Sequence, residues 1–224
     1  MAIPGFRNNP IIKEFNGLKR FFRSHETNVS RQRIGDFKKF SEMLGNEEVA
    51  FDLMGSVNFG QAKEYSDTDI VIYLRCEHRE ECDPASCPEV KLYRDIFMNT
   101  LVFEYKANPY SIQIVDCINL NQLDEDIKNK QANSLVLLRF GFYRSVCRGI
   151  NRKLLRVYED KLAQSPELCS MVEESLKECF SGLIRSSQHS YSFKKYVERM
   201  EEEGIKIPPT MAGKIQSYLS SNQE

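Results

Sequence analysis

Residues 55–70 read GSVNFGQAKEYSDTDI and form the most specific pattern in the chain. The mostly apolar segment 49–54 before them predicts a strand that ends at Gly55 and Ser56. Gly55 permits a tight turn, and the backbone N–H groups that open a helix can bind an anion. The Ser56 hydroxyl adds one more hydrogen-bond donor. The turn therefore predicts a binding site for phosphate oxygens.

Two aspartates, Asp67 and Asp69, begin the apolar run 67–74, which predicts a second, buried strand. Side chains two positions apart on a strand point to the same face, so the two carboxylates can bind one metal ion. A strand this apolar would not begin with two adjacent negative charges unless a cation or solvent compensates for them. The alternative is a solvated strand end that binds no ligand.

A third carboxylate is expected from Asp116, within the apolar segment 110–118. The apolar run 101–106 and the segment 110–118, with an Asn-Pro turn signal between them, predict a hairpin. Its second strand would place Ile112, Ile114 and Asp116 on one face. With the two earlier aspartates, Asp116 would complete a site for two Mg²⁺ ions, which stabilise attacking and leaving oxygens. The alternative is an aspartate that caps the following loop.

The segments just described resemble the signature of the polymerase-beta-like nucleotidyltransferase superfamily. In that pattern an apolar strand ends in Gly-Ser, Asp-x-Asp follows after a short gap, and a third carboxylate lies on a neighbouring strand. The pattern covers residues 49–118, about a third of the chain, and its residues here are Gly55, Ser56, Asp67, Asp69 and Asp116.

The resemblance implies a magnesium-dependent enzyme that transfers a nucleoside monophosphate from a nucleoside triphosphate to a hydroxyl acceptor and releases pyrophosphate. The three aspartates would bind Mg²⁺, for which Mn²⁺ can substitute, and Gly55 and Ser56 would bind the phosphates. ATP is the default nucleotide, because adenylyl transfer is common in the superfamily. The acceptor stays open between an RNA end, a protein hydroxyl and a small molecule. Two alternatives keep the same fold: a non-catalytic nucleotide-binding or regulatory module, and a component of a toxin–antitoxin pair.

The sequence predicts an α+β fold, with a small mixed β-sheet flanked by helices and followed by a helical C-terminal module. Residues 1–48 carry helical spacing and are expected to pack on the catalytic core, 49–121, which includes an insertion loop at 76–90. Residues 122–224 are expected to form a helical domain. A catalytic sheet followed by helices is also the usual plan of small nucleotidyltransferases, so the resemblance supports this division.

Composition indicates the cellular setting but not the substrate. The chain has 224 residues and a formal net charge of −1, so its overall charge implies no attraction to nucleic acid or to an anionic membrane. No apolar run is long enough to span a membrane, and charged residues interrupt the N-terminal segment before a signal-peptide core. Seven cysteines without a secretory signal favour reduced thiols and a cytoplasmic location. The oligomeric state is not indicated.

Three arginines, Arg144, Arg148 and Arg152, recur every four residues. On one helix this spacing would keep the guanidinium groups on a slowly turning face. Such a face can bind the triphosphate or an acceptor phosphate through bidentate contacts. The alternative is a solvated surface paired with acidic residues elsewhere, and Gly149 weakens the case for an unbroken helix.

The insertion loop contains Cys76, His78, Cys82 and Cys87. Three thiols and an imidazole are ligands that suit a structural zinc site. The spacing differs from that of a standard zinc finger, and the superfamily signature does not include zinc at this position. The alternative is a charged insertion with incidental thiols.

Overall fold

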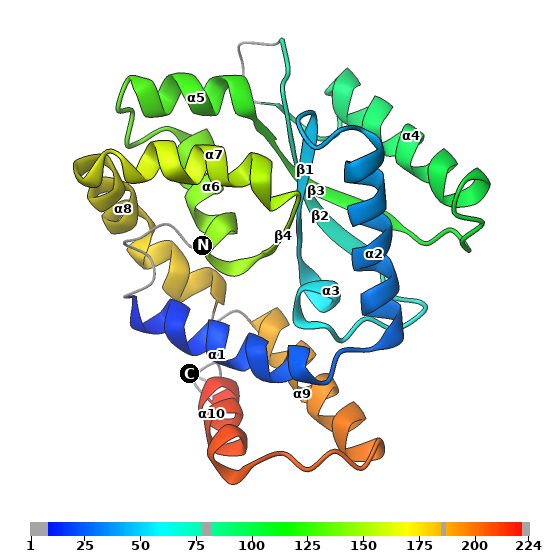
Figure 1. The fold of residues 1–224 in the computed structure, drawn as a ribbon. Coiled ribbons are helices and arrows are strands. Elements are labelled where there is room, and N and C mark those ends of the chain that lie inside the picture. Colours follow the sequence, from blue (N-terminus) through cyan, green and yellow to red (C-terminus); the bar gives the residue numbers. More distant parts are fainter. Residues whose placement is uncertain (1–8, 78–81, 185–186, 221–224) are drawn as a thin grey trace.

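The computed structural model describes residues 9–77, 82–184 and 187–220, and Figure 1 shows their arrangement. In chain order the elements are α1 (Pro10–Ser24), α2 (Asn28–Met43), β1 (Val49–Leu53), α3 (Gly55–Phe59), β2 (Thr68–Leu74), α4 (Pro88–Phe103), β3 (Ile112–Asn119), α5 (Leu120–Lys128), α6 (Leu135–Val146), β4 (Arg148–Ile150), α7 (Arg152–Ala163), α8 (Pro166–Ile184), α9 (Ser187–Glu202) and α10 (Pro209–Ser220).

The four strands form one mixed sheet in the order β3-β2-β1-β4. Strand β1 runs antiparallel to β2 and to β4, whereas β2 and β3 are parallel. Parallel neighbours need a crossover connection, and α4 supplies it. The predicted hairpin is therefore wrong: the run 101–106 is not a strand, because its first residues finish α4. Pro88 begins this helix, and Val90, Phe97 and Leu101 form its buried face at helical spacing.

Helices α2 and α4 cover one face of the sheet (Figure 1). Aromatic rings fill the contact between them and the strands. The ring centroids of Phe37 and Phe97 lie 4.4 Å apart in a stacked arrangement, and Phe37 meets Phe51 of β1 edge-on at 5.0 Å. Offset and edge-to-face pairs of this kind contribute beyond their buried area. This cluster fixes the sheet against α2.

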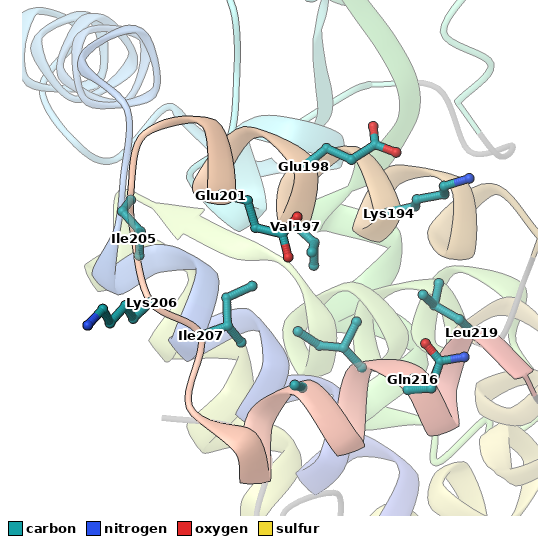
Figure 2. A pocket seen from close by; sticks show the side chains of 11 residues that line it. Lys194, Val197, Glu198, Glu201, Ile205, Lys206, Ile207, Gln216 and Leu219 are labelled. Carbon is teal, nitrogen blue, oxygen red and sulfur yellow. The ribbon is translucent and has the colours of Figure 1, made fainter.

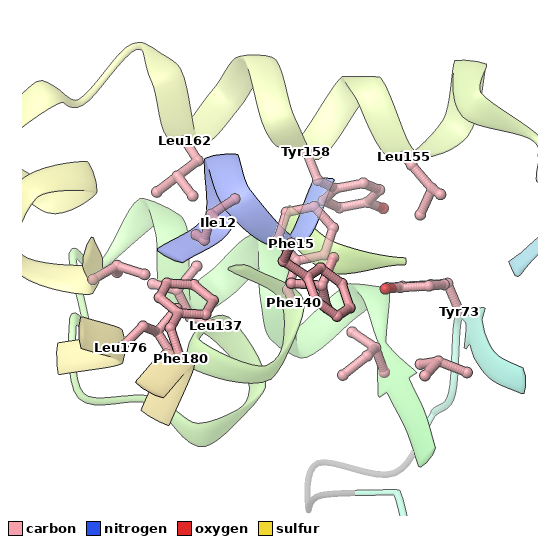
Figure 3. Packing of buried hydrophobic residues seen from close by; sticks show 14 of the residues in the cluster. Ile12, Phe15, Tyr73, Leu137, Phe140, Leu155, Tyr158, Leu162, Leu176 and Phe180 are labelled. Atoms are coloured by element: carbon pink, nitrogen blue, oxygen red, sulfur yellow. The ribbon is translucent and has the colours of Figure 1, made fainter. Parts of the chain in front are cut away.

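The opposite face of the sheet packs against α1 and the helices that follow β3. Figure 3 shows Tyr73 of β2 projecting toward Phe140 and Tyr158, and the Tyr73 and Phe140 ring centroids are 6.1 Å apart. Helix α1 belongs to this side: Phe22 lies 5.3 Å from the ring of Phe193 and 5.3 Å from that of Tyr196, both on α9. The two N-terminal helices thus pack on opposite sides of the sheet.

The predicted fold class is confirmed, because one small mixed sheet is flanked by helices and the C-terminal part is helical. Residues 122–224 also contribute β4, the edge strand next to β1, so this segment is not helical throughout. The division into three domains stays a prediction. Within the described ranges, no helix is both long enough and apolar enough to cross a membrane.

Candidate functional site

The Gly55 turn brings the end of β1 against the start of β2. Gly55 has a φ of +52°, and a Cβ atom at this position would lie 2.2 Å from Oδ2 of Asp69. The backbone N–H of Met54 donates to the carbonyl of Asp69 at 2.8 Å. Glycine is therefore required twice, for its left-handed backbone and for the space that the Asp69 carboxylate occupies. Helix α3 has only five residues, so its dipole adds little to anion binding.

Asp67 and Asp69 line one cavity of about 770 Å³ together with Gly55 and Ser56. Asp67 is exposed and immediately precedes β2, whereas Asp69 is half-buried within it. Burial, and after it the charge of Asp67, raise the pKa of the Asp69 carboxyl. The two carboxylates repel each other and Asp69 is in addition poorly solvated, so a bound cation would relieve both costs.

The loop that carries Asp67 is held by Arg33 of α2, a residue without a motif in the sequence. Its buried guanidinium donates to the carbonyl of Ser66 at 2.5 Å, to that of Asp67 at 3.2 Å and to Thr68 Oγ1 at 3.1 Å. It also donates to the backbone carbonyls of residues 63 and 64. Arg33 lies on the buried stripe of α2, between Ser30 and Phe37. The signal that could have identified Arg33 from the sequence is a charged residue on an apolar face of a predicted helix.

Aromatic residues from distant helices also line this cavity. Phe142 and Tyr143 of α6 and His189 and Tyr196 of α9 line the same cavity. Burial first, and also the charge of Asp69, raise the pKa of Tyr196 to about 12, so its hydroxyl stays protonated at neutral pH. These rings offer flat apolar surfaces on which a nucleobase can stack.

A β-bulge determines where Asp116 points. Ile70 of β2 pairs with Ile114, but the next residue, Val71, pairs with Asp116, so Val115 is the extra residue. The predicted common face for Ile112, Ile114 and Asp116 is therefore wrong. The two isoleucines pack toward α2 and α4, whereas Asp116 faces α6 on the side of Val71.

Asp116 is held by donors from α6 and from its own strand. The hydroxyl of Tyr143 donates to Oδ2 at 2.7 Å, Nη1 of Arg139 lies 3.2 Å from Oδ1, and the backbone N–H of Cys117 donates to Oδ1 at 2.8 Å. Asp116 is not among the residues that line the cavity of Asp67 and Asp69, and in the described part of the chain the three aspartates do not form a compact group of ligand atoms. Tyr143 links them, because it lines the cavity and binds Asp116.

The arginine stripe does not lie on one helix, so its predicted common face is wrong. Helix α6 ends at Val146, β4 occupies 148–150, and α7 begins at Arg152. Strand β4 forms because this segment pairs with the free edge of β1. Four-residue spacing alone could not show that pairing.

Arg144 is buried in an ion-pair network rather than aimed at a phosphate site. Its Nη1 lies 2.5 Å from Asp52 Oδ1, and its Nε lies 2.7 Å from Glu159 Oε1. Tyr73 donates to the second oxygen of Asp52 at 2.5 Å. A Cβ atom on Gly149 would lie 2.8 Å from Arg144 Nη1, so glycine makes room for the guanidinium.

Arg148 and Arg152 lie near a basic surface on α1 that the sequence did not indicate. Arg148 pairs with Glu26 at 2.5 Å, and Arg152 is exposed at the start of α7. Burial, followed by the charge of Arg23, lowers the pKa of Lys19 to about 7, and burial, followed by Arg148, lowers that of Arg23 to about 9. Burial is the larger cause of both shifts, and the neighbouring arginines add to it. A cavity of about 590 Å³ here is lined by Lys13, Lys19, Arg20 and Arg23, and Cys147 lines both it and the aspartate cavity.

The cysteine loop brings thiols together as the sequence suggested. The Sγ atoms of Cys76 and Cys82 are 2.9 Å apart and those of Cys76 and Cys87 are 3.7 Å apart. All three are buried, and their sulfur atoms lie within 4.8 Å of one another, so this cluster can hold a metal ion. His78, the fourth predicted ligand, lies outside the described residues.

A further cavity, of about 760 Å³, lies between α9 and α10 and shares no lining residue with the aspartate cavity (Figure 2). Figure 2 shows apolar side chains such as Val197, Ile207 and Leu219 beside the charged Lys194 and Glu201. Its described lining holds no pair of aspartates and no cysteine, so we place the candidate site at Asp67 and Asp69.

Comparison of the chain with protein-family models, with curated proteins and with solved structures finds no match. The resemblance to the nucleotidyltransferase superfamily therefore rests on the residues of segment 49–118 themselves.

Proposed function

We propose that this chain is a metal-dependent nucleotidyltransferase, which transfers a nucleoside monophosphate from a nucleoside triphosphate, ATP by default, to a hydroxyl acceptor with release of pyrophosphate. The observation that carries the proposal is the single cavity shared by Gly55, Ser56, Asp67 and Asp69. The absence of a side chain at residue 55 is what gives the Asp69 carboxylate its place in that cavity.

The donor set fits a hard divalent cation. Asp67 and Asp69 offer carboxylate oxygens, the ligands that Mg²⁺ and Mn²⁺ prefer, and no thiol belongs to this pair. The raised pKa of Asp69 reflects the burial and repulsion that a cation would compensate for. Bound there, Mg²⁺ would neutralise charge on the phosphates and on the departing pyrophosphate.

Other side chains at the cavity would bind the phosphates, position the metal ligands and contact the base. Ser56 donates to a phosphate oxygen, Arg33 holds the loop that presents Asp67, and Phe142 and Tyr196 stack on the base and exclude water. Asp116 is the proposed third carboxylate and helps to deprotonate the acceptor hydroxyl. Its hydrogen bond to Tyr143 connects it with the cavity.

One observation favours the alternative of a module that binds a nucleotide without transferring it. Asp116 is engaged by Arg139 and Tyr143 rather than facing the same cavity as the other two aspartates. A third carboxylate neutralised in this way would leave nucleotide binding intact and remove the group proposed to assist the acceptor. A toxin–antitoxin component would use the same cavity.

For the acceptor we favour an RNA end over a protein hydroxyl. The cavity lined by Lys13, Arg20 and Arg23 adjoins the aspartate cavity at Cys147, and it gathers positive charge although the whole chain carries a net charge of −1. Such a local surface attracts a phosphate backbone by neutralising its charge.

The test is incubation of the protein with each labelled nucleoside triphosphate, Mg²⁺ or Mn²⁺, and either total RNA or lysate protein. We expect label on RNA with one nucleotide, loss of transfer in Asp69→Asn, and normal transfer in Asp95→Asn. Asp95 is a matched control because it is exposed on α4, on the other face of the sheet. Label on protein would refute RNA as the acceptor but would leave the proposed transferase activity standing. Nucleotide binding without transfer in any combination would refute the enzyme and support the binding module.

We also propose that the metal of the cysteine cluster is zinc, with a structural role, because thiolates select zinc over magnesium. All seven cysteines are free of disulfides, which is the state expected in a reducing cytoplasm. Elemental analysis of protein purified without chelator tests this proposal, and about one equivalent of zinc is expected. Zinc-free protein would leave the loop as an ordinary insertion.

A further inference from the structure

Helix α1 contributes four positive side chains to one cavity, the one of about 590 Å³ that Cys147 shares with the aspartate cavity. The charged residues of its lining are Lys13, Lys19, Arg20 and Arg23. Their separations along the chain are close to whole helical turns, so a single face of α1 presents them together. The described lining of this cavity holds no acidic residue. Positive charge therefore gathers here without a counter-charge in the cavity wall.

Among the described residues, none of these four cations forms an ion pair. Arg23 donates instead to the backbone carbonyl of Asn58 at 2.6 Å and to its side-chain oxygen at 2.5 Å. The carboxylate of Glu26, near Arg23 in the chain, is paired with Arg148. Neighbouring positive charges without acidic partners repel one another, and a bound anion would remove that cost.

Lys19 is the cation for which water can compensate least. The residue is only 4% exposed, and its Nζ donates to the carbonyl of Val146 at 2.5 Å. This carbonyl is its single hydrogen-bond acceptor within the described part of the chain, although an ammonium group has three N–H donors. A buried charge with unused donors is costly unless a ligand accepts from them. Lys19 thus provides a buried group that a ligand of opposite charge can satisfy.

We propose that this cavity binds a compact phosphate anion, such as inorganic phosphate or pyrophosphate, through Lys19, Arg20 and Arg23. Ammonium and guanidinium groups form charge-assisted hydrogen bonds with phosphate oxygens, and arginine can form two at once. Because Cys147 lines both cavities, the bound phosphate lies beside the candidate site. Anion binding does not depend on the proposed function, but the source of the phosphate does. Two sources share this chemistry: the pyrophosphate that transfer releases and a phosphate of the RNA acceptor.

Binding of the anion is coupled to protonation of Lys19. Its pKa is about 7 without an anion, and a negative charge beside an ammonium group raises its pKa. The other groups that act on it are Arg23 of α1, Asp52 of β1, Arg148 of β4 and Cys147. The pKa of Arg23 stays near 9, and burial raises that of the Cys147 thiol, so neither changes its charge between pH 6 and pH 8. A dianion should therefore bind more tightly at pH 6 than at pH 8.

Calorimetric titration of the protein with pyrophosphate, without added divalent ions, tests the site. We expect binding to the wild type and binding that is about tenfold weaker or more in Lys19→Met, which removes charge-assisted hydrogen bonds. Arg20→Ala changes an exposed residue, so the fold is kept, and it should also bind more weakly. Arg94→Ala is the matched control and should bind as the wild type does, because Arg94 is an exposed arginine of α4, on the other face of the sheet.

Titration with sulfate tests the coupling, because sulfate stays a dianion between pH 6 and pH 8. Higher affinity at pH 6 in the wild type, and weak binding at both pH values in Lys19→Met, would support it; equal wild-type affinity at both would overturn it. A short single-stranded RNA that displaces pyrophosphate would assign the site to the acceptor, and pyrophosphate retained in its presence would assign the site to the product. The proposal fails if the wild type binds neither anion, or if Lys19→Met and Arg20→Ala bind as tightly as the wild type. None of these readouts involves nucleotide transfer, so failure of the proposed enzyme is a separate result.

Discussion

Replacing Gly55 with alanine tests the contact on which the candidate site depends. The change has two costs: an alanine with a φ of +52° is strained by about 1–2 kcal/mol, and its Cβ would lie 2.2 Å from Asp69 Oδ2. The carboxylate must therefore move by an ångström or more. Because a displacement of about 1 Å can reduce catalysis by about 10²-fold, we expect a loss of transfer of at least that size.

Gly204→Ala is the matched control, because Gly204 has a φ of +72° and no atom lies within 4 Å of its added Cβ. The variant has the strain of an alanine at positive φ, but its Cβ contacts no other atom. Urea unfolding should show both variants destabilised by about 1–2 kcal/mol, with a larger loss in Gly55→Ala. Mn²⁺ titration and label transfer should be impaired in Gly55→Ala alone. If both variants bind Mn²⁺ and transfer label as the wild type does, the reasoning about Gly55 and Asp69 is wrong.

Three further predictions concern charged residues. Asp69→Asn should abolish divalent-dependent transfer yet stabilise the metal-free protein at neutral pH. The folded-state pKa of Asp69 is raised, so its ionised carboxylate lowers the free energy of unfolding as the pH rises through that pKa. Unfolding of wild type and variant at pH 4 and pH 7 without divalent ions should therefore show the variant as the more stable protein at pH 7. Arg144→Ala should lower the free energy of unfolding by about 3–5 kcal/mol, since Asp52 and Glu159 would stay buried without the positive charge of the guanidinium. The exposed Arg152→Ala should change this free energy by less than about 0.5 kcal/mol. Arg148→Ala should raise the requirement for triphosphate or RNA and reduce its salt dependence, with partial rescue by lysine; equal kinetics at two salt concentrations would remove Arg148 from the site.

The local part of the site could be predicted from the sequence because its determinants are neighbours in the chain. Two apolar runs predict two strands, which form as expected apart from a strand start at Thr68 instead of Asp67. Their antiparallel pairing comes from the structure. The same short segment brings Asp67 and Asp69 to the turn at Gly55.

The errors arise where a distant segment determines the outcome. The bulge that turns Asp116 depends on the register between β2 and β3, which no alternation within 110–118 can show. The break in the arginine stripe depends on the exposed edge of β1, more than ninety residues earlier in the chain. Apolar composition near residue 101 suited a strand or a buried helix face equally, and Pro88 was the stronger signal.

The composition of the cavity wall also bears on when the site can form during synthesis. Residues from segment 54–69 line the cavity together with Tyr196 of α9, and Arg199 of the same helix donates to Gln61 Oε1 at 3.0 Å across 138 positions. Contacts of such high sequence separation are established late in folding, because a long loop must close first. A nascent chain that has exposed only the sheet would have its two aspartates and the rings of α6, but not His189 and Tyr196 of α9. Ribosome-bound chains ending before α9 should therefore have an incomplete cavity even when β1 and β2 have paired.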